Sequence, residues 1–308
     1  MTTTQKSLHE YCTLQPGKDQ LNALQLMEKF IQGTESEDVF ILRGSAGTGK
    51  TTLTQALSAW LSDLSVPCYL AAPTGRAAKI ISSKTGRIAK TIHSLIYIPE
   101  QGANGISVVL KRKMNPNQKA CVFIIDEASM ISDLAGGNDK FIASKSLLDD
   151  LISYVKEGNK ESKIIFIGDR FQLPPIHSTF SPALDPEYLR KKHKLKVAFT
   201  ELTEVVRHQQ DSYILKNACN LRSHMEGKYN FYGLELPRLS NSTQALQTFQ
   251  QYEIENKHDQ VALIAFTNRD VNWFNSAYRI LKYKKPNILM PGDSVFLNQN
   301  WSGNGNFF

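Results

Sequence analysis

Residues 44–51 read Gly-Ser-Ala-Gly-Thr-Gly-Lys-Thr, and this stretch decides the fold. Its glycines, lysine and hydroxyl occupy the fixed positions of a phosphate-binding loop. The apolar run at residues 39–42 before it predicts a buried strand, and residues 52–64 after it repeat apolar side chains at helical spacing. A strand, a glycine loop and a helix in this order aim backbone N–H groups and a helix N-terminus at phosphate. The alternative is a glycine turn that arose by chance.

The loop and the residue after it are the predicted nucleotide-binding segment: Gly44, Ser45, Ala46, Gly47, Thr48, Gly49, Lys50, Thr51 and Thr52. We expect Lys50 to reach the β- and γ-phosphates of ATP and to act in catalysis. We expect the Thr51 hydroxyl to hold Mg²⁺. ATP and Mg²⁺ are therefore the predicted cofactors.

Short β-branched runs alternate with amphipathic helical patterns along the chain. The runs are residues 39–42, 66–71, 121–125, 163–167 and 261–266, and the helical patterns lie near residues 19–32, 52–64, 76–83, 144–156, 211–225 and 269–283. This alternation predicts an α/β protein with a parallel sheet and helices on both faces. Residues 98–120 break the rhythm with turn residues around a short alternating run and predict an inserted β-hairpin.

The composition is that of a soluble globular protein with a modest basic excess. The 308 residues are 41% hydrophobic and 21% charged, and the formal net charge is +7. Such a charge suits a polyanionic partner but does not by itself indicate one. Four scattered cysteines without a CxxC pair, two of them inside apolar runs, predict buried thiols in a reducing compartment without zinc or disulfides. No apolar run approaches the roughly 20 residues of a membrane span. We therefore expect a cytoplasmic protein without a membrane partner.

Carboxylates follow the apolar run at residues 121–125. We expect Asp126 to stay ionised and to hold Mg²⁺, and Glu127 to polarise the attacking water as a general base. The alternative is a plain helix cap. The run at residues 163–167 ends in Gly168-Asp169-Arg170-Phe171-Gln172. Gln172 is a candidate for contact with the γ-phosphate, whereas Asp169 capping a turn is an equal interpretation of this segment.

Five segments carry a resemblance to a known family: GSAGTGKT at 44–51, AAPTGRAA at 71–78, TIH at 91–93, IIDEAS at 124–129 and GDRFQLPP at 168–175. In this order they resemble the superfamily 1 helicases that move 5′→3′, in particular the RecD-like and Dda-like group. The resemblance covers about residues 16–300. It implies a P-loop, RecA-like motor that couples ATP hydrolysis to movement on single-stranded DNA.

The resemblance also implies roles for single residues. Gln20 is similar to the glutamine that reads adenine. Arg207, in the run from Glu201, resembles the catalytic arginine that reaches the γ-phosphate from the second domain when the cleft closes. A surface arginine is the alternative. The residues expected at single-stranded DNA are Pro73, Thr74, Arg76 and His93, although a core or capping role for His93 is an equal interpretation.

The resemblance implies two RecA-like domains. Residues 1–199 would form the first, with the 98–120 hairpin in the place of a pin that splits duplex junctions, and its Lys111-Arg112-Lys113 run would track a backbone. Residues 200–308 would form part of the second, ending at the start of its β-barrel insertion. The family's last motifs, including a second arginine, do not occur. We therefore expect this chain to bind nucleotide and single-stranded DNA without unwinding duplex alone, and a partner chain is a candidate for supplying those motifs.

Two other functional classes stay open from the sequence. One is a P-loop ATPase of another kind, such as a protein remodeller. The other is a catalytically dead remnant that binds nucleotide or single-stranded DNA and has no helicase activity. Stimulation of ATP hydrolysis by DNA separates the first from a helicase, and any ATP turnover excludes the second. RNA in place of DNA also stays open.

Overall fold

The computed structural model describes most of the chain in two compact units, which divide between Tyr232 and Gly233. The described residues are 6–33, 36–101, 108–135, 141–142, 145–204, 213–228, 230, 233, 239–255, 261–284, 290–291, 302–303 and 306–307. The predicted domain boundary at residues 199 and 200 stays a prediction, and strand β9 of the first unit runs across it.

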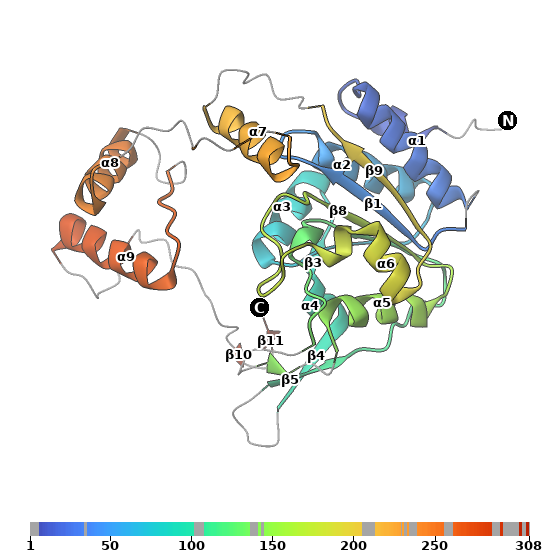
Figure 1. Cartoon of the computed structure of the whole chain (residues 1–308). Coiled ribbons are helices and arrows are strands. Elements are labelled where there is room, and N and C mark those ends of the chain that lie inside the picture. The colour runs from blue at the N-terminus through green and yellow to red at the C-terminus, as the bar shows by residue number, and fades with distance from the viewer. Residues whose placement is uncertain are drawn as a thin grey trace. The chain divides into compact units, whose positions relative to one another are not determined.

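A six-stranded parallel sheet forms the centre of the first unit (Figure 1). Its strands, in spatial order, are β3 (Ala89–Thr91), β2 (Cys68–Ala72), β6 (Val122–Ile125), β8 (Lys163–Gly168), β1 (Val39–Gly44) and β9 (Val197–Leu202). The middle strands β6, β8 and β1 are buried along almost their whole length. Both faces of these strands are covered, which is why they are continuous apolar runs in the sequence. The predicted α/β class is confirmed.

Helices cover both faces of this sheet, and each face has its own apolar cluster. One cluster includes side chains from α1 (Lys18–Gln32), α2 (Lys50–Asp63) and α3 (Gly75–Thr85), together with the short 3-10 helix η1 (Leu8–Tyr11). The other includes side chains from α4 (Ile92–Ile96), α5 (Leu147–Gly158) and α6 (Pro186–His193), with the 3-10 turns η2 (Ala128–Met130) and η3 (Pro182–Leu184). Helix α7 (Tyr213–Met225) completes the described helices of this unit.

The predicted β-hairpin insertion is confirmed. Strand β4 (Tyr97–Gln101) pairs antiparallel with β5 (Val108–Arg112), and β7 (Phe141–Ile142) adds to β5 in parallel. Arg112 attaches this small sheet to α5, because its guanidinium lies 3.5 Å from the Asp150 carboxylate and 2.5 Å from that of Glu157. The hairpin is therefore fixed to the rest of the first unit at its base.

The second unit contains the helices α8 (Ser242–Glu255) and α9 (Asn268–Tyr283) and a short antiparallel pair, β10 (Ser302–Gly303) and β11 (Asn306–Phe307). The rings of Phe249 and Tyr278 join the two helices at a centroid distance of 5.3 Å. The helix predicted at 269–283 is confirmed.

The strand predicted at 261–266 is wrong for the part of the chain that the structure describes. Residues 261–265 have no assigned secondary structure and belong to none of the described sheets, with Ile264 92% exposed and Phe266 fully exposed. An apolar run becomes a strand only when neighbouring strands satisfy its backbone hydrogen bonds. The strand predicted at residues 293–297 lies outside the described residues.

Among the described helices, none combines the length and the apolar character that crossing a membrane requires. The cysteine thiols are free, but only that of Cys121 is buried. Cys12 and Cys68 are partly buried and Cys219 is exposed, so the prediction of buried thiols is wrong for Cys219.

Candidate nucleotide-binding site

The loop at residues 44–51 joins the end of β1 to the start of α2 at the carboxyl edge of the sheet. Gly47 and Gly49 have positive φ angles of 85° and 92°, which side chains rarely adopt. A Cβ atom on Gly49 would also lie 2.2 Å from the side-chain nitrogen of Gln20. The left-handed backbone therefore favours glycine at positions 47 and 49, and a Cβ atom at position 49 would also displace the Gln20 side chain.

Lys50, the first residue of α2, holds its amine inside the loop. Nζ donates hydrogen bonds to the carbonyls of Gly44, at 2.7 Å, and Ser45, at 3.0 Å. Burial lowers the pKa of Lys50, and the negative charge of Asp169 is the largest opposing effect. Phosphate oxygens can take the place of these carbonyls, since both are acceptors for the same ammonium donor.

Ser45 offers a donor that the protein itself does not use. Its side chain is 5% exposed, and within the described residues its Oγ has no hydrogen-bond partner. Its carbonyl, in contrast, accepts from the Thr48 hydroxyl at 2.8 Å. A buried hydroxyl without a partner is unfavourable unless a ligand or water satisfies it. The loop therefore fits an anionic ligand with acceptor oxygens.

Asp126 follows β6 at the same edge and is buried. Its Oδ1 accepts a hydrogen bond of 2.9 Å from the backbone N–H of Glu127. Burial raises the pKa of Asp126 to about 6. At pH 7 the ionised carboxylate therefore has a cost in free energy that a nearby cation would offset. That Asp126 is held ionised beside a metal ion stays a prediction. The oxygens of Asp126 and Thr51 are of the type that Mg²⁺ prefers.

Glu127 has a left-handed backbone, with φ 52° and ψ 36°. A residue other than glycine pays about 1–3 kcal/mol for such a conformation, and such strain clusters at functional sites. Glu127 precedes η2, yet its side chain forms no capping hydrogen bond within the described chain. The plain helix cap that the sequence left open is therefore not what the structure shows.

The Asp169 side chain, which the sequence left ambiguous, is both a turn cap and a neighbour of Lys50. Its Oδ1 accepts a hydrogen bond of 2.9 Å from the N–H of Phe171. Strand β8 lies between β6 and β1, with Gly168 opposite Arg43. Asp169 therefore lies between the loop and the carboxylates of Asp126 and Glu127. Gln172, in the same turn, is exposed.

Gln20 is buried against the loop with both ends of its amide in use. Its Nε2 donates to the Thr48 carbonyl at 2.9 Å, and its Oε1 accepts from the Gly17 N–H at 3.0 Å. The adenine contact of Gln20 stays a prediction. Arg207 lies outside the described residues.

The structure brings the four predicted DNA-contacting residues to neighbouring strand ends. Strand β2 pairs with β3 so that Ala72 lies opposite Thr91. Pro73, Thr74 and Arg76 follow the first strand, and His93 follows the second. The Thr74 hydroxyl caps α3 by accepting from the Ala77 N–H at 3.2 Å, whereas the side chains of Arg76 and His93 are exposed.

The basic run on the hairpin is engaged within the protein. Lys111 pairs with Glu100 at 3.0 Å, and Lys113 donates to the Ser94 carbonyl at 2.7 Å. Arg112 is held by α5, as described above. The run therefore stabilises the hairpin in this structure, and its contact with a nucleic-acid backbone stays a prediction.

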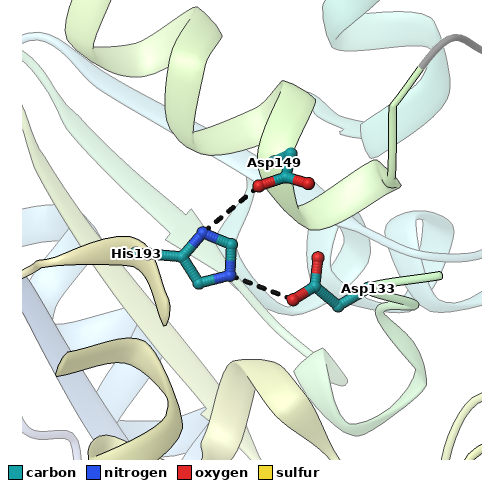
Figure 2. A group of neighbouring side chains, drawn as sticks. All are labelled: Asp133, Asp149 and His193. Carbon is teal, nitrogen blue, oxygen red and sulfur yellow. Dashed lines mark hydrogen bonds and ion pairs between the residues drawn. The ribbon is translucent and has the colours of Figure 1, made fainter. Parts of the chain in front are cut away.

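A second polar cluster lies elsewhere in the unit, and Figure 2 shows His193 between Asp133 and Asp149. The Nε2 atom of His193 is 3.0 Å from a carboxylate oxygen of Asp133, and the Nδ1 atom of His193 is 3.3 Å from one of Asp149. The three side chains have the spacing of metal ligands, but the Lys192 ammonium already lies 2.8 Å from the same Asp133 oxygen. The cluster is an ion-pair network that joins α6 to α5 and to the segment after β6.

A family model described as an AAA domain matches residues 28–178. The chain is 29% identical over 291 residues to the ATP-dependent DNA helicase dda of Enterobacteria phage T4, which covers 91% of this chain and 60% of the phage protein.

A second relative is the ATP-dependent RecD2 DNA helicase of Deinococcus radiodurans, 32% identical over 136 residues, or 44% of this chain and 16% of that protein. Among solved structures, the Pif1 helicase from Candida albicans aligns with a TM-score of 0.48 and 18% identity over 86% of this chain and 54% of that one. The chain thus spans 60% or less of the length of each of these proteins.

Proposed function

We propose that this chain, a relative of the Dda- and RecD-like helicases of superfamily 1, is the motor portion of an ATP-dependent DNA helicase or translocase. It would hydrolyse ATP at the loop of residues 44–51 and couple hydrolysis to 5′→3′ movement on single-stranded DNA in the cytoplasm. One observation carries the proposal. Lys50 and the carboxylates of Asp126, Glu127 and Asp169 lie at one edge of the sheet and influence one another electrostatically.

Each residue of the site has a separate proposed role in ATP hydrolysis. The loop amides and the Ser45 hydroxyl bind phosphate oxygens, and Lys50 neutralises charge on the β- and γ-phosphates. Glu127 accepts the proton of the attacking water, and Gln172 contacts the γ-phosphate. Asp126 and Thr51 would hold a Mg²⁺ ion, which supplies further positive charge when bound.

Single-stranded DNA is the proposed partner at the neighbouring strand ends. The exposed guanidinium of Arg76 and the helix N-terminus capped by Thr74 suit a phosphate group. Pro73 and His93 would flank the strand. The hairpin at residues 98–120 would meet a duplex junction, and Arg207 would complete the charge at the γ-phosphate when the domains close. The 5′→3′ direction rests on the order of motifs alone.

Lys50→Ala tests the nucleotide chemistry. The variant loses the ammonium that neutralises the phosphate oxygens, so we expect steady-state ATP hydrolysis to fall to background. Lys119→Ala is the matched control, because Lys119 is exposed and precedes β6, at the opposite edge of the sheet from the loop. ATP turnover by Lys50→Ala at the level of the control would overturn the proposal.

A further inference from the structure

Arg222 on α7 lies beside the turn that follows β8. Its guanidinium carbon is 5.6 Å from the centre of the Phe171 ring. Arg170 stands 4.6 Å from the centre of the same ring. Phe171 belongs to the turn that Asp169 caps, and that turn also carries Gln172. The ring therefore holds Arg222 next to the edge of the sheet where the phosphate-binding residues gather.

The Arg222 guanidinium has an N–H group without a hydrogen-bond acceptor among the described residues. This group is Nε–H, and it is shielded from solvent. Glu226, one helical turn further on, interacts with the charge of Arg222. That carboxylate is already shared by Arg170, at 3.3 Å, and Lys228, at 2.6 Å. A buried guanidinium nitrogen without an acceptor is costly, and an anion would satisfy it.

Arg222 also acts electrostatically on the loop. The positive charge of Arg222 acts on the Lys50 ammonium, and the carboxylates of Asp169, Glu127 and Asp126 act in the opposite sense. Two cations that repel each other across a loop shaped for phosphate are both relieved when a phosphate group lies near them. Since Lys50 belongs to the loop and Arg222 comes from α7, the two cations approach that position from separate elements.

We propose that Arg222 is a catalytic residue that contacts the γ-phosphate of ATP together with Lys50, and that stacking on Phe171 presents it there. This inference rests on the proposed ATP hydrolysis. The turn of Asp169 and Gln172 follows β8, between the carboxylates of Asp126 and Glu127 on one side and the phosphate-binding loop on the other. A guanidinium arriving along that turn therefore meets the γ-phosphate and stabilises the charge that develops there during hydrolysis.

The test compares Arg222→Ala and Arg222→Lys with Leu221→Ala. Leu221 is the adjacent residue of α7 and is 41% exposed, so its variant controls for damage to the helix. Three quantities are measured for each: the affinity for ADP, the affinity for the non-hydrolysable analogue AMPPNP, and the turnover of ATP. Only AMPPNP and ATP carry the γ-phosphate group.

For Arg222→Ala we expect ADP affinity within about twofold of the unchanged chain, AMPPNP affinity lower by about tenfold or more, and turnover lower by about 100-fold or more. Arg222→Lys should restore part of the AMPPNP affinity, because it keeps the charge but loses the planar donor geometry. Leu221→Ala should match the unchanged chain. If Arg222→Ala does not fold, the same three quantities are compared between Arg222→Lys and the unsubstituted chain.

Two results would overturn the inference. Equal losses of ADP and AMPPNP affinity would show that Arg222 only anchors α7 to the turn. Unchanged AMPPNP affinity and turnover would show that it does not meet the phosphate at all. If Lys50→Ala loses hydrolysis in the same assay, such a result leaves the proposed function standing. If Lys50→Ala hydrolyses ATP normally, the proposed function itself fails.

Discussion

The side-chain amide of Gln20 donates a hydrogen bond of 2.9 Å to the backbone carbonyl of Thr48. Helix α1 therefore holds the phosphate-binding loop in place from outside the β1–α2 unit. The same side chain lies where a Cβ atom on residue 49 would clash with it. One buried amide thus links the N-terminal helix to both the position and the residue choice of the loop.

We predict that Gln20→Ala weakens nucleotide binding by about 2- to 10-fold, as expected for the loss of one or two hydrogen bonds that order the loop. Affinity for ADP and GDP is the measurement. The loss common to both nucleotides reports the anchoring of Thr48. An additional loss for ADP alone reports the proposed contact with adenine. Unchanged affinity for both nucleotides would contradict the anchoring role.

Asp126→Asn should stabilise the nucleotide-free chain at neutral pH. Its pKa of about 6, against an ordinary 3.8, means that burying the ionised carboxylate costs up to about 3 kcal/mol above pH 6. The amide avoids this cost. Because the folded pKa is raised, the gain should be full above pH 6 and should shrink to nothing as the pH falls to about 4.

Thermal unfolding between pH 4 and pH 8 measures this gain. Glu161→Gln serves as the control, because Glu161 is exposed. At pH 8, a melting temperature of Asp126→Asn that equals or falls below that of the unsubstituted chain would contradict the view that Asp126 is buried in its ionised form at a cost in free energy.

Glu127→Gln should separate chemistry from binding. The variant removes the general base but keeps the size of the side chain, so we expect ATP turnover to fall by about 100-fold or more while AMPPNP affinity stays unchanged. Asp126→Asn should instead lose the Mg²⁺-dependent part of that affinity. Equal loss of affinity in both variants would show that the two carboxylates do not have separate roles.

The Asp133 cluster should respond as a structural ion-pair network. Burial raises the pKa of Asp133, but hydrogen bonds lower it more, and the pKa lies below its ordinary value. These bonds come from Lys192, Ser146, Tyr188 and His193. Its contribution to stability is therefore present at neutral pH and is lost as the pH falls through that lowered pKa. We predict that Asp133→Asn lowers the free energy of unfolding by about 3 kcal/mol at pH 7.

Urea unfolding measures the Asp133 effect, with and without added Zn²⁺ or Mn²⁺. The unchanged chain should unfold at the same urea concentration in both cases, because Lys192 already supplies the positive charge at Asp133. A large shift of the midpoint on adding either metal would show that the cluster is a metal site.

The strands that were predicted correctly from the sequence are those buried on both faces of the sheet. Residues 39–44 and 163–168 are such strands, and their apolar runs are unbroken. Strand β9 was missed because it lies at the edge of the sheet, where buried and partly exposed residues mix. The opposite error occurred at 261–266, where an apolar run lacks a described neighbour and is not a strand.

The candidate site was predicted to the extent that its residues lie in a fixed local order. Lys50 follows a strand within the loop pattern, and Asp126 and Glu127 directly follow another strand, so residue order alone predicted where they lie. Their roles stay predictions. The position of Asp169 between them depends on the strand order β6, β8 and β1, which no local pattern contains. The contact of Arg222 with Phe171 depends on how α7 packs, so residue type and spacing gave no signal for it.

Stimulation of ATP hydrolysis by single-stranded DNA tests the proposed function most directly. The measurement is the steady-state turnover of the 308-residue chain with no nucleic acid, with single-stranded DNA and with blunt duplex DNA, at low and high salt. We predict turnover that rises severalfold with single-stranded DNA, rises less with duplex, and loses the stimulation as salt weakens the phosphate contacts. Turnover that is the same in all three conditions would contradict a DNA motor and would point to a P-loop ATPase of another class.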